Sequence, residues 1–335
     1  MKFTGPPESY QNLFLYRMDM TVAARLRNLE EYESVKRWIT RLNKKSGSLE
    51  TRRKYLHYLE KFCEYAGRNP DELVEERRDD LRSEDIFVRR RAEDLLDRWF
   101  TELERKGLSR NTCVLAYNAV RSFYKANYLE LEMEKTPSTW PVKVKPGLTR
   151  EDLRALLEAC RKPMHRAYIL CQVQSGLGVS DLLKITYNLV EDQLKKGASH
   201  IHLRLLRGKR KELGWFDTFF GRMATQALRE YLATRRDLKP GCRRRLFPCT
   251  VRNVNKFLKT LSFRAGLGWT VSSHDLRKFF NTQLKMARVN DPRFNETLIE
   301  YWMGHSIGKV KKAYFIPPVE EQLRLYKMAE PRLEP

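Results

Sequence analysis

Residues 272–282 read Ser-Ser-His-Asp-Leu-Arg-Lys-Phe-Phe-Asn-Thr, and the rest of the chain is interpreted around them. Ser272 or Ser273 is expected to cap the start of a helix. The apolar anchors of that helix are Phe279, Phe280, Leu284 and Met286. His274 and Arg277 are three residues apart, so a helix would place an imidazole and a guanidinium on one face. A guanidinium can grip two phosphate oxygens, and an imidazole can move a proton near neutral pH.

Two elements further along the chain add to this chemistry. Met303-Gly304-His305 supplies a second imidazole, and Tyr314, nine residues after His305, offers a phenolic nucleophile. A single His-x-x-Arg is usually a surface pair and a single Gly-His is usually a turn. Three such elements, in order and at these intervals, are far more specific than any one of them.

Together, His274-x-x-Arg277, Met303-Gly304-His305 and Tyr314 resemble the C-terminal signature of the tyrosine recombinases (phage-integrase family), with Met303 where leucine is usual. The resemblance implies site-specific DNA cleavage and rejoining through a 3′-phosphotyrosyl intermediate. Tyr314 would be the nucleophile, Arg277 and His305 would hold the non-bridging oxygens, and His274 would accept or relay a proton. It also implies that no metal or cofactor is needed, and that a dimer or tetramer assembles on double-stranded DNA.

Residues 174–182 depart from the family pattern, because Gly178 stands where members usually carry a phosphate-gripping arginine. Losing one charged transition-state donor commonly costs on the order of 10²–10³ in rate. Arg204, Arg207 and Arg210 are close in sequence to a predicted hairpin and are candidates to fill the gap. We therefore expect retained but atypical activity.

The predicted hairpin consists of residues 200–206 and 213–220, in which apolar and polar residues alternate. Its basic tip resembles the family's β-hairpin, which delivers a lysine to the leaving oxygen. Counting back from the second strand favours Lys211, with Lys209 a close second. The alternative for either lysine is a solvated basic turn that touches the DNA backbone.

The chain divides, in this interpretation, into four parts. Residues 1–19 are a loose arm, and the helical patterns of residues 20–134 resemble the family's core-binding domain, half of a clamp around DNA. Residues 135–147 contain three prolines and are the linker candidate. Residues 148–335 would form the catalytic domain, including a last helix over 319–333. The expected fold class is mainly α with a small β-sheet: a helical core-binding domain plus an α+β catalytic domain.

Periodicity also places the individual helices. The expected helical ranges are 20–44, 70–76, 83–106, 221–238, 250–265 and 295–303. His200 and His202 alternate on one face of a strand and lack a third ligand nearby, so we take them as structural.

Composition points to a polyanionic partner. The chain has 335 residues and a net charge of +23, well beyond what solubility requires, and DNA is the simplest partner. Candidate DNA contacts are Arg52, Arg110, Arg207, Arg210, Arg252, Lys256, Lys309 and Lys311. For each of them, ordinary solvated surface charge is the alternative.

Several classes are disfavoured. No apolar run is long enough to span a membrane, and the N-terminal residues lack the pattern of a signal peptide, so a cytoplasmic location is expected. Six scattered cysteines include no Cys-x-x-Cys pair, which disfavours a zinc ribbon or a redox motif. Two alternatives to a recombinase stay open: a DNA-binding protein of the same fold whose chemistry has lapsed, and a type IB topoisomerase.

Overall fold

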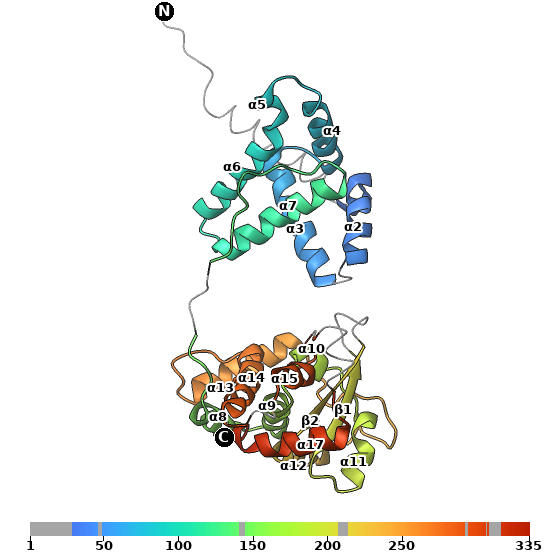
Figure 1. Cartoon of the computed structure of the whole chain (residues 1–335), viewed down its shortest axis with the longest axis vertical. Coiled ribbons are helices and arrows are strands. Elements are labelled where there is room, and N and C mark those ends of the chain that lie inside the picture. The colour runs from blue at the N-terminus through green and yellow to red at the C-terminus, as the bar shows by residue number, and fades with distance from the viewer. Residues whose placement is uncertain are drawn as a thin grey trace, which may run out of the picture. The chain divides into compact units, whose positions relative to one another are not determined.

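The computed structural model describes residues 29–45, 49–140, 145–206, 214–291, 294–305, 307 and 316–335. It contains two compact units, unit 1 (Met1–Lys143) and unit 2 (Val144–Pro335), shown in Figure 1. The described part of unit 1 is helical, and unit 2 adds one two-stranded antiparallel sheet to a set of helices. The fold is therefore mainly α with a small sheet, as the sequence predicted.

The described part of unit 1 consists of helices of different lengths. Its elements are η1 (Leu29–Glu31), α2 (Glu33–Lys45), α3 (Leu49–Ala66), α4 (Pro70–Asp80), α5 (Ile86–Arg89), α6 (Arg91–Arg105) and α7 (Arg110–Ala126). Helix α7 packs against α2, α3 and α6. Trp38 meets Phe123 edge-on, with 5.6 Å between ring centroids, and Phe62 meets Trp99 at 5.1 Å. The first ring pair joins α2 to α7 and the second joins α3 to α6. With its three helix partners, α7 is the central helix of the unit.

Three of the helices expected in unit 1 were wrong in extent. The helix expected over 20–44 is interrupted: η1 precedes α2, which begins at Glu33, and residues 20–28 lie outside the described residues. The helix expected over 83–106 is divided at Arg90. Helix α5 leaves Ile86 and Phe87 exposed, so the apolar stripe that a continuous helix would bury begins only with α6. Helix α4 continues four residues beyond the expected end at residue 76.

Unit 2 holds the remaining elements. They are α8 (Arg150–Glu158), α9 (Pro163–Ser175), α10 (Val179–Leu182), η2 (Tyr187–Leu189), α11 (Glu191–Lys195), β1 (Ile201–Leu206), β2 (Trp215–Phe220), α12 (Arg222–Ala233), α13 (Val251–Arg264), α14 (Ser273–Asn290), α15 (Glu296–Trp302), α17 (Val319–Ala329) and η4 (Glu330–Arg332).

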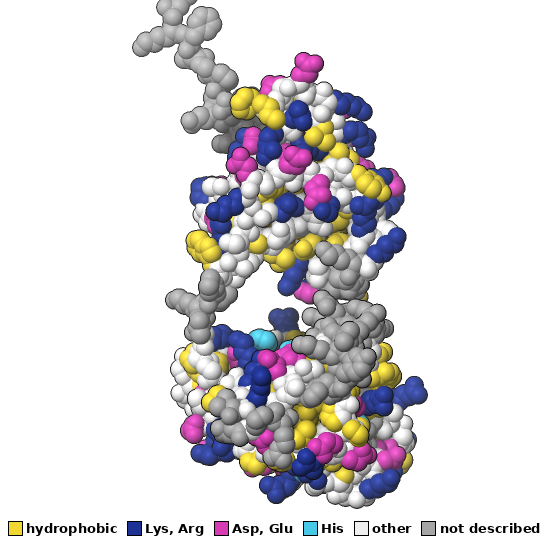
Figure 2. All heavy atoms as spheres, in the orientation of Figure 1, with side chains coloured by type: hydrophobic (Ala, Val, Ile, Leu, Met, Phe, Trp, Pro, Cys, Tyr) yellow, Lys and Arg dark blue, Asp and Glu magenta, His cyan; other side chains and the backbone are white. Residues whose placement is uncertain are grey.

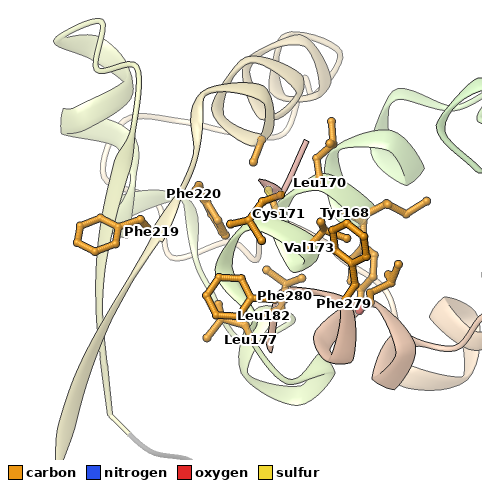
Figure 3. Close-up of a cluster of buried hydrophobic side chains, with 14 of the residues drawn as sticks. Tyr168, Leu170, Cys171, Val173, Leu177, Leu182, Phe219, Phe220, Phe279 and Phe280 are labelled. Carbon is orange, nitrogen blue, oxygen red and sulfur yellow. The ribbon is translucent and has the colours of Figure 1, made fainter. Parts of the chain in front are cut away.

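Helix α9 is the centre of unit 2. Every residue from 167 to 175 is buried, as expected of a helix enclosed on all sides. It packs against α12, α14 and β2. Figure 3 shows the resulting cluster of apolar side chains, drawn from α9, β2 and α14. The C-terminal end of α9 is thereby fixed in position.

The hairpin is confirmed, with Ile201 paired to Phe220 and Leu206 to Trp215; residues 207–213 lie outside the described residues. Asp217 of β2 is nearly buried, and its two carboxylate oxygens lie 2.7 Å from His202 Nε2 and 2.6 Å from the Tyr301 hydroxyl, which donates to it. Burial alone would raise the Asp217 pKa, but the bonds from His202 and Tyr301 hold it below its ordinary range. Asp217 therefore ties α15 to the hairpin.

His200, the residue just before β1, also has a carboxylate partner. Its Nε2 lies 2.7 Å from Glu330 Oε2. Among the described residues, no group of three His, Cys, Asp or Glu side chains is arranged to hold a metal ion. No helix in the described ranges combines the length and apolar character needed to cross a membrane.

Three expectations about the helices of unit 2 were also wrong. Met286 was expected to be an apolar anchor of α14, but it is 53% exposed, because the buried face of the helix passes through Phe280, Leu284 and Ala287 instead. Helix α12 ends at Ala233, short of the expected 238. The last helix, expected over 319–333, ends as α17 at Ala329 and is followed by η4.

Replacing Tyr301 with phenylalanine should lower the free energy of unfolding by about 1–3 kcal/mol, because it leaves a buried Asp217 oxygen without a donor. The Asp217 pKa is depressed in the folded protein, so its contribution is present at neutral pH and is lost as the pH falls below about 4. Urea titrations at neutral and acid pH measure the difference. Tyr65→Phe, at an exposed position, is the control. Equal stabilities of the two variants would contradict the role given to this bond.

Candidate active site

The stretch from residue 272 forms the start of α14, as predicted. Ser272 is the N-cap, and both its backbone N–H and its hydroxyl donate to Asp275 Oδ2, at 2.8 and 2.6 Å. The Ser273 hydroxyl is buried and accepts a bond of 2.6 Å from Gln172 Nε2. The same Gln172 amide donates to the Leu177 carbonyl at 3.1 Å. Gln172 thus fixes the start of α14 to the turn that follows α9.

Arg277 is half-buried and links its own helix, α14, to the C-terminal ends of two other helices. Its Nη1 donates to the Gly176 carbonyl at 2.8 Å, and its Nη2 donates to the Met303 carbonyl at 2.9 Å. Gly176 and Met303 are the C-cap residues of α9 and α15. Nη2 also lies 2.6 Å from His305 Nε2. Burial lowers the pKa of the Arg277 guanidinium, and the Asp181 and Glu300 carboxylates act in the opposite direction.

Gly178 borders this guanidinium. A Cβ built at residue 178 would lie 3.6 Å from Arg277 Nη1 and 3.6 Å from Asp181 Oδ2, which is ordinary contact. The backbone there has φ −66° and ψ 149°, a conformation that any residue adopts. A side chain at this position would therefore start at the guanidinium without strain.

His305 is placed by the end of α15. Gly304 has φ +71°, and a Cβ there would come within 3.0 Å of the Phe216 ring. The His305 backbone N–H donates to the Glu300 carbonyl at 2.9 Å, and its ring Nδ1 contacts Glu300 Oε2. Lys285 Nζ lies 3.8 Å from the other oxygen of Glu300. The imidazole is thus held between Arg277 and a carboxylate.

The structure brings only part of the predicted set together. Arg277 and His305 are in contact, whereas His274 is exposed on the first turn of α14, three residues before Arg277. Tyr314 and both candidate lysines, Lys209 and Lys211, lie outside the described residues, as do Arg207, Arg210, Lys309 and Lys311. Arg204, a candidate to replace the missing arginine, is exposed on β1, and its charge acts on Asp217.

The four described DNA-contact candidates differ in their surroundings. Arg52 pairs with Glu30 at 2.6 Å. Arg110 pairs with Glu104 and lies over the rings of Phe100 and Trp140, so it has an evident structural role.

Arg252 and Lys256 are both exposed on α13, and that helix contains no acidic residue. Figure 2 shows lysine and arginine side chains over the visible faces of both units, and histidines at the surface of unit 2 beside basic side chains.

Three residues at the site were missed from the sequence: Gln172, Lys285 and Glu300. Gln172 contacts a helix that is far away in the chain, and Lys285 contacts the next helix, so neither is marked by a pattern within its own helix. Glu300 carries a weak signal, because it stands five residues before His305 in a predicted helix, but only the turn at Gly304 brings the two side chains together.

The sequence model of the phage integrase family matches residues 147–315, half of the chain. The matched range contains His274, Arg277, His305 and Tyr314. The chain belongs to this family, the tyrosine recombinases, whose members are DNA strand transferases.

Relatives and solved structures agree with this assignment. The chain is 25% identical over 299 residues to the tyrosine recombinase XerA of Thermococcus kodakarensis, covering 87% of this chain and 93% of that protein. It is 26% identical over 300 residues to XerA of Thermococcus onnurineus, covering 87% and 91%. A solved structure of XerH site-specific recombinase bound to palindromic difH substrate has a similar fold. Its TM-score is 0.53 at 19% identity, covering 84% of this chain and 81% of that one.

Replacing Gly304 with alanine should destabilise the protein and displace His305, because the left-handed backbone costs about 1–2 kcal/mol and the added Cβ meets Phe216. Gly197→Ala is a matched control: it has the same φ of +71° and nothing within 4 Å of the added Cβ. Unfolding titrations of the two variants isolate the Phe216 contact. Equal losses of stability would show that this contact does not place the His305 turn.

Proposed function

We propose that this protein is a site-specific recombinase in which Tyr314 attacks a DNA phosphodiester while Arg277, His305 and His274 act on the same phosphate. The observation that carries the proposal is the Arg277–His305 contact. Arg277 and His305 are 28 residues apart in the chain, and Arg277 Nη2 lies 2.6 Å from His305 Nε2. His274 is exposed on α14, the helix that carries Arg277. A phosphate that replaced this contact would have both side chains within reach of its non-bridging oxygens.

The proposed reaction breaks one P–O bond and makes another. The Tyr314 oxygen attacks phosphorus and loses its proton, which His274 accepts or relays. The bond to the 5′ oxygen breaks, and Lys211 or Lys209 protonates that leaving group. The product is a 3′-phosphotyrosyl link, which keeps the energy of the broken bond. Another 5′ hydroxyl can therefore reverse the step and exchange strands without ATP, a metal or a cofactor.

Duplex DNA is the proposed partner. The net charge of +23 supports this, and the salt dependence of binding is expected to be steep. Arg252 and Lys256 on α13 are the described residues best suited to contact it. Unit 1 would act as the core-binding half of a clamp, with self-association to a dimer or tetramer on DNA. The proposed location is the cytoplasm.

The main competing function is DNA binding without chemistry, and the specific observation in its favour is Gly178. The position borders Arg277 but supplies no donor. A type IB topoisomerase would share the chemistry but act as a monomer, so relaxation of supercoiled DNA without a two-site requirement would favour it. Trapping of the covalent intermediate tests directly whether the protein binds DNA without chemistry.

Tyr314→Phe should abolish covalent attachment and leave DNA affinity within about twofold, because only the nucleophilic oxygen is removed. The substrate is a duplex whose sequence the full chain selects from a random pool, nicked so that the released 5′ strand diffuses away. Denaturing gels then report the protein–DNA adduct. An adduct of equal yield in the phenylalanine variant would remove Tyr314 from the nucleophile role. No adduct with the parent protein would favour the lapsed-chemistry alternative.

Gly178→Arg should fold, because a Cβ at residue 178 meets only ordinary contacts. It should raise the rate of adduct formation about 10- to 1000-fold, because it adds a charged donor beside Arg277. Gly178→Gln, similar in length and uncharged, is the matched control and should give a much smaller gain. Single-turnover cleavage of the nicked duplex measures both. Equal rates for the two variants would mean that no cation is missing at this position.

A further inference from the structure

Glu300 is the one carboxylate in contact with the predicted catalytic side chains in the described part of the chain. One of its oxygens faces His305 Nδ1, and the other lies 3.8 Å from Lys285 Nζ. Lys285 also pairs with Glu296 at 2.9 Å, and Glu296 pairs with Arg288 at 3.3 Å. A ladder of alternating charge between α14 and α15 therefore ends at the imidazole.

The two contacts of the His305 ring have different hydrogen-bond requirements. A guanidinium has only donors, so Nε2, which lies 2.6 Å from Arg277 Nη2, must accept and carry no hydrogen. An ionised carboxylate only accepts, so the nitrogen facing Glu300 must carry the hydrogen. These two contacts therefore suit an imidazole that carries a hydrogen on Nδ1 and none on Nε2.

A bound phosphate changes these hydrogen-bond requirements. Its non-bridging oxygens accept, so both Arg277 and His305 must donate to them. Nε2 then needs a hydrogen, and the Glu300 carboxylate still requires one on Nδ1. Both requirements are met together only by the doubly protonated, positively charged imidazolium.

We propose that Glu300 is a positioning residue that makes His305 a cation whenever His305 donates to a DNA phosphate. This rests on the proposed function, in which His305 holds a non-bridging oxygen. Binding DNA then takes up one proton at His305. The site gains a second positive charge beside Arg277, the charge that Gly178 does not supply.

The surrounding charges are consistent with this role. The described groups that face His305 are Arg277 from α14 and Glu300 from α15, with Lys285 of α14 behind Glu300. Lys285 offsets the negative charge of Glu300. A carboxylate isolated there would itself repel the phosphate, whereas a carboxylate paired with a lysine holds the imidazolium without that penalty.

Glu300→Gln separates the charge of this residue from its shape. A glutamine amide has nearly the same size but can accept from Nδ1–H or, after turning over, donate to an unprotonated Nδ1. In the variant, His305 can therefore donate through Nε2 while staying neutral. Glu296→Gln is the matched control, since it removes a carboxylate of the same ladder that does not contact the imidazole.

The first measurement is proton uptake. The full chain carrying Tyr314→Phe is titrated with the selected duplex by calorimetry, near pH 8, in buffers of different ionisation enthalpy. Uptake should be about one proton greater than in a second protein that also carries His305→Asn. Adding Glu300→Gln should abolish this difference, and adding Glu296→Gln should preserve it. A parent that takes up no more protons than the His305→Asn protein would overturn the proposal.

The second measurement is single-turnover cleavage of the nicked duplex with Tyr314 restored. Glu300→Gln should slow cleavage about 10- to 100-fold with DNA affinity within about twofold, and Glu296→Gln should cleave at the parental rate. If the parent forms the adduct and Glu300→Gln forms it equally fast, the role of Glu300 is disproved and the recombinase function stands. If the parent forms no adduct, the recombinase function itself has failed.

Discussion

The bonds from Arg277 to two helix C-termini are the interaction on which the site depends. The last carbonyls of a helix have no partner within it, and they carry the negative end of the helix dipole. The guanidinium satisfies the carbonyls of Gly176 and Met303, which cap α9 and α15, and it projects from α14. One side chain thus fixes three helices and keeps a cation partly out of water. The cost of that burial, visible in its lowered pKa, is offset by the two dipoles and by nearby carboxylates.

The contacts of Arg277 depend on the rigid packing of α9 and α15 in the core of unit 2. A guanidinium can hold an anion at a defined place only if the carbonyls that hold the guanidinium do not move. Helix α9 is buried on all sides, so its C-terminal end is rigid. The end of α15 is held from the other direction, through Tyr301 on Asp217 and Gly304 on the Phe216 ring. The small sheet serves the site by supporting the turn that carries His305.

The sequence predicted the local elements of the site better than the contacts between them. Spacing alone identified α14 and the hairpin, because periodicity and capping are local properties. It also placed Arg277 and His305 in one site, and these two residues are in contact. It could not predict Glu300 beside His305, since that contact requires the left-handed turn at Gly304. Met286 shows the opposite failure: it was expected to be an apolar anchor, but the buried face passes through Leu284 and Ala287 and leaves Met286 exposed. Periodicity locates an apolar face and does not show which residues at its margin a partner covers.

The electrostatics of the site follow from what is absent at Gly178. A phosphorane carries more negative charge than the phosphate from which it forms, so each missing cation raises the barrier. In the proposed role of Glu300, part of the charge missing at residue 178 comes from His305, whose two ring nitrogens contact Arg277 and Glu300. The imidazole would gain its second hydrogen only when a phosphate replaces Arg277 at Nε2. An arginine at residue 178 would add a further, permanent cation to the site.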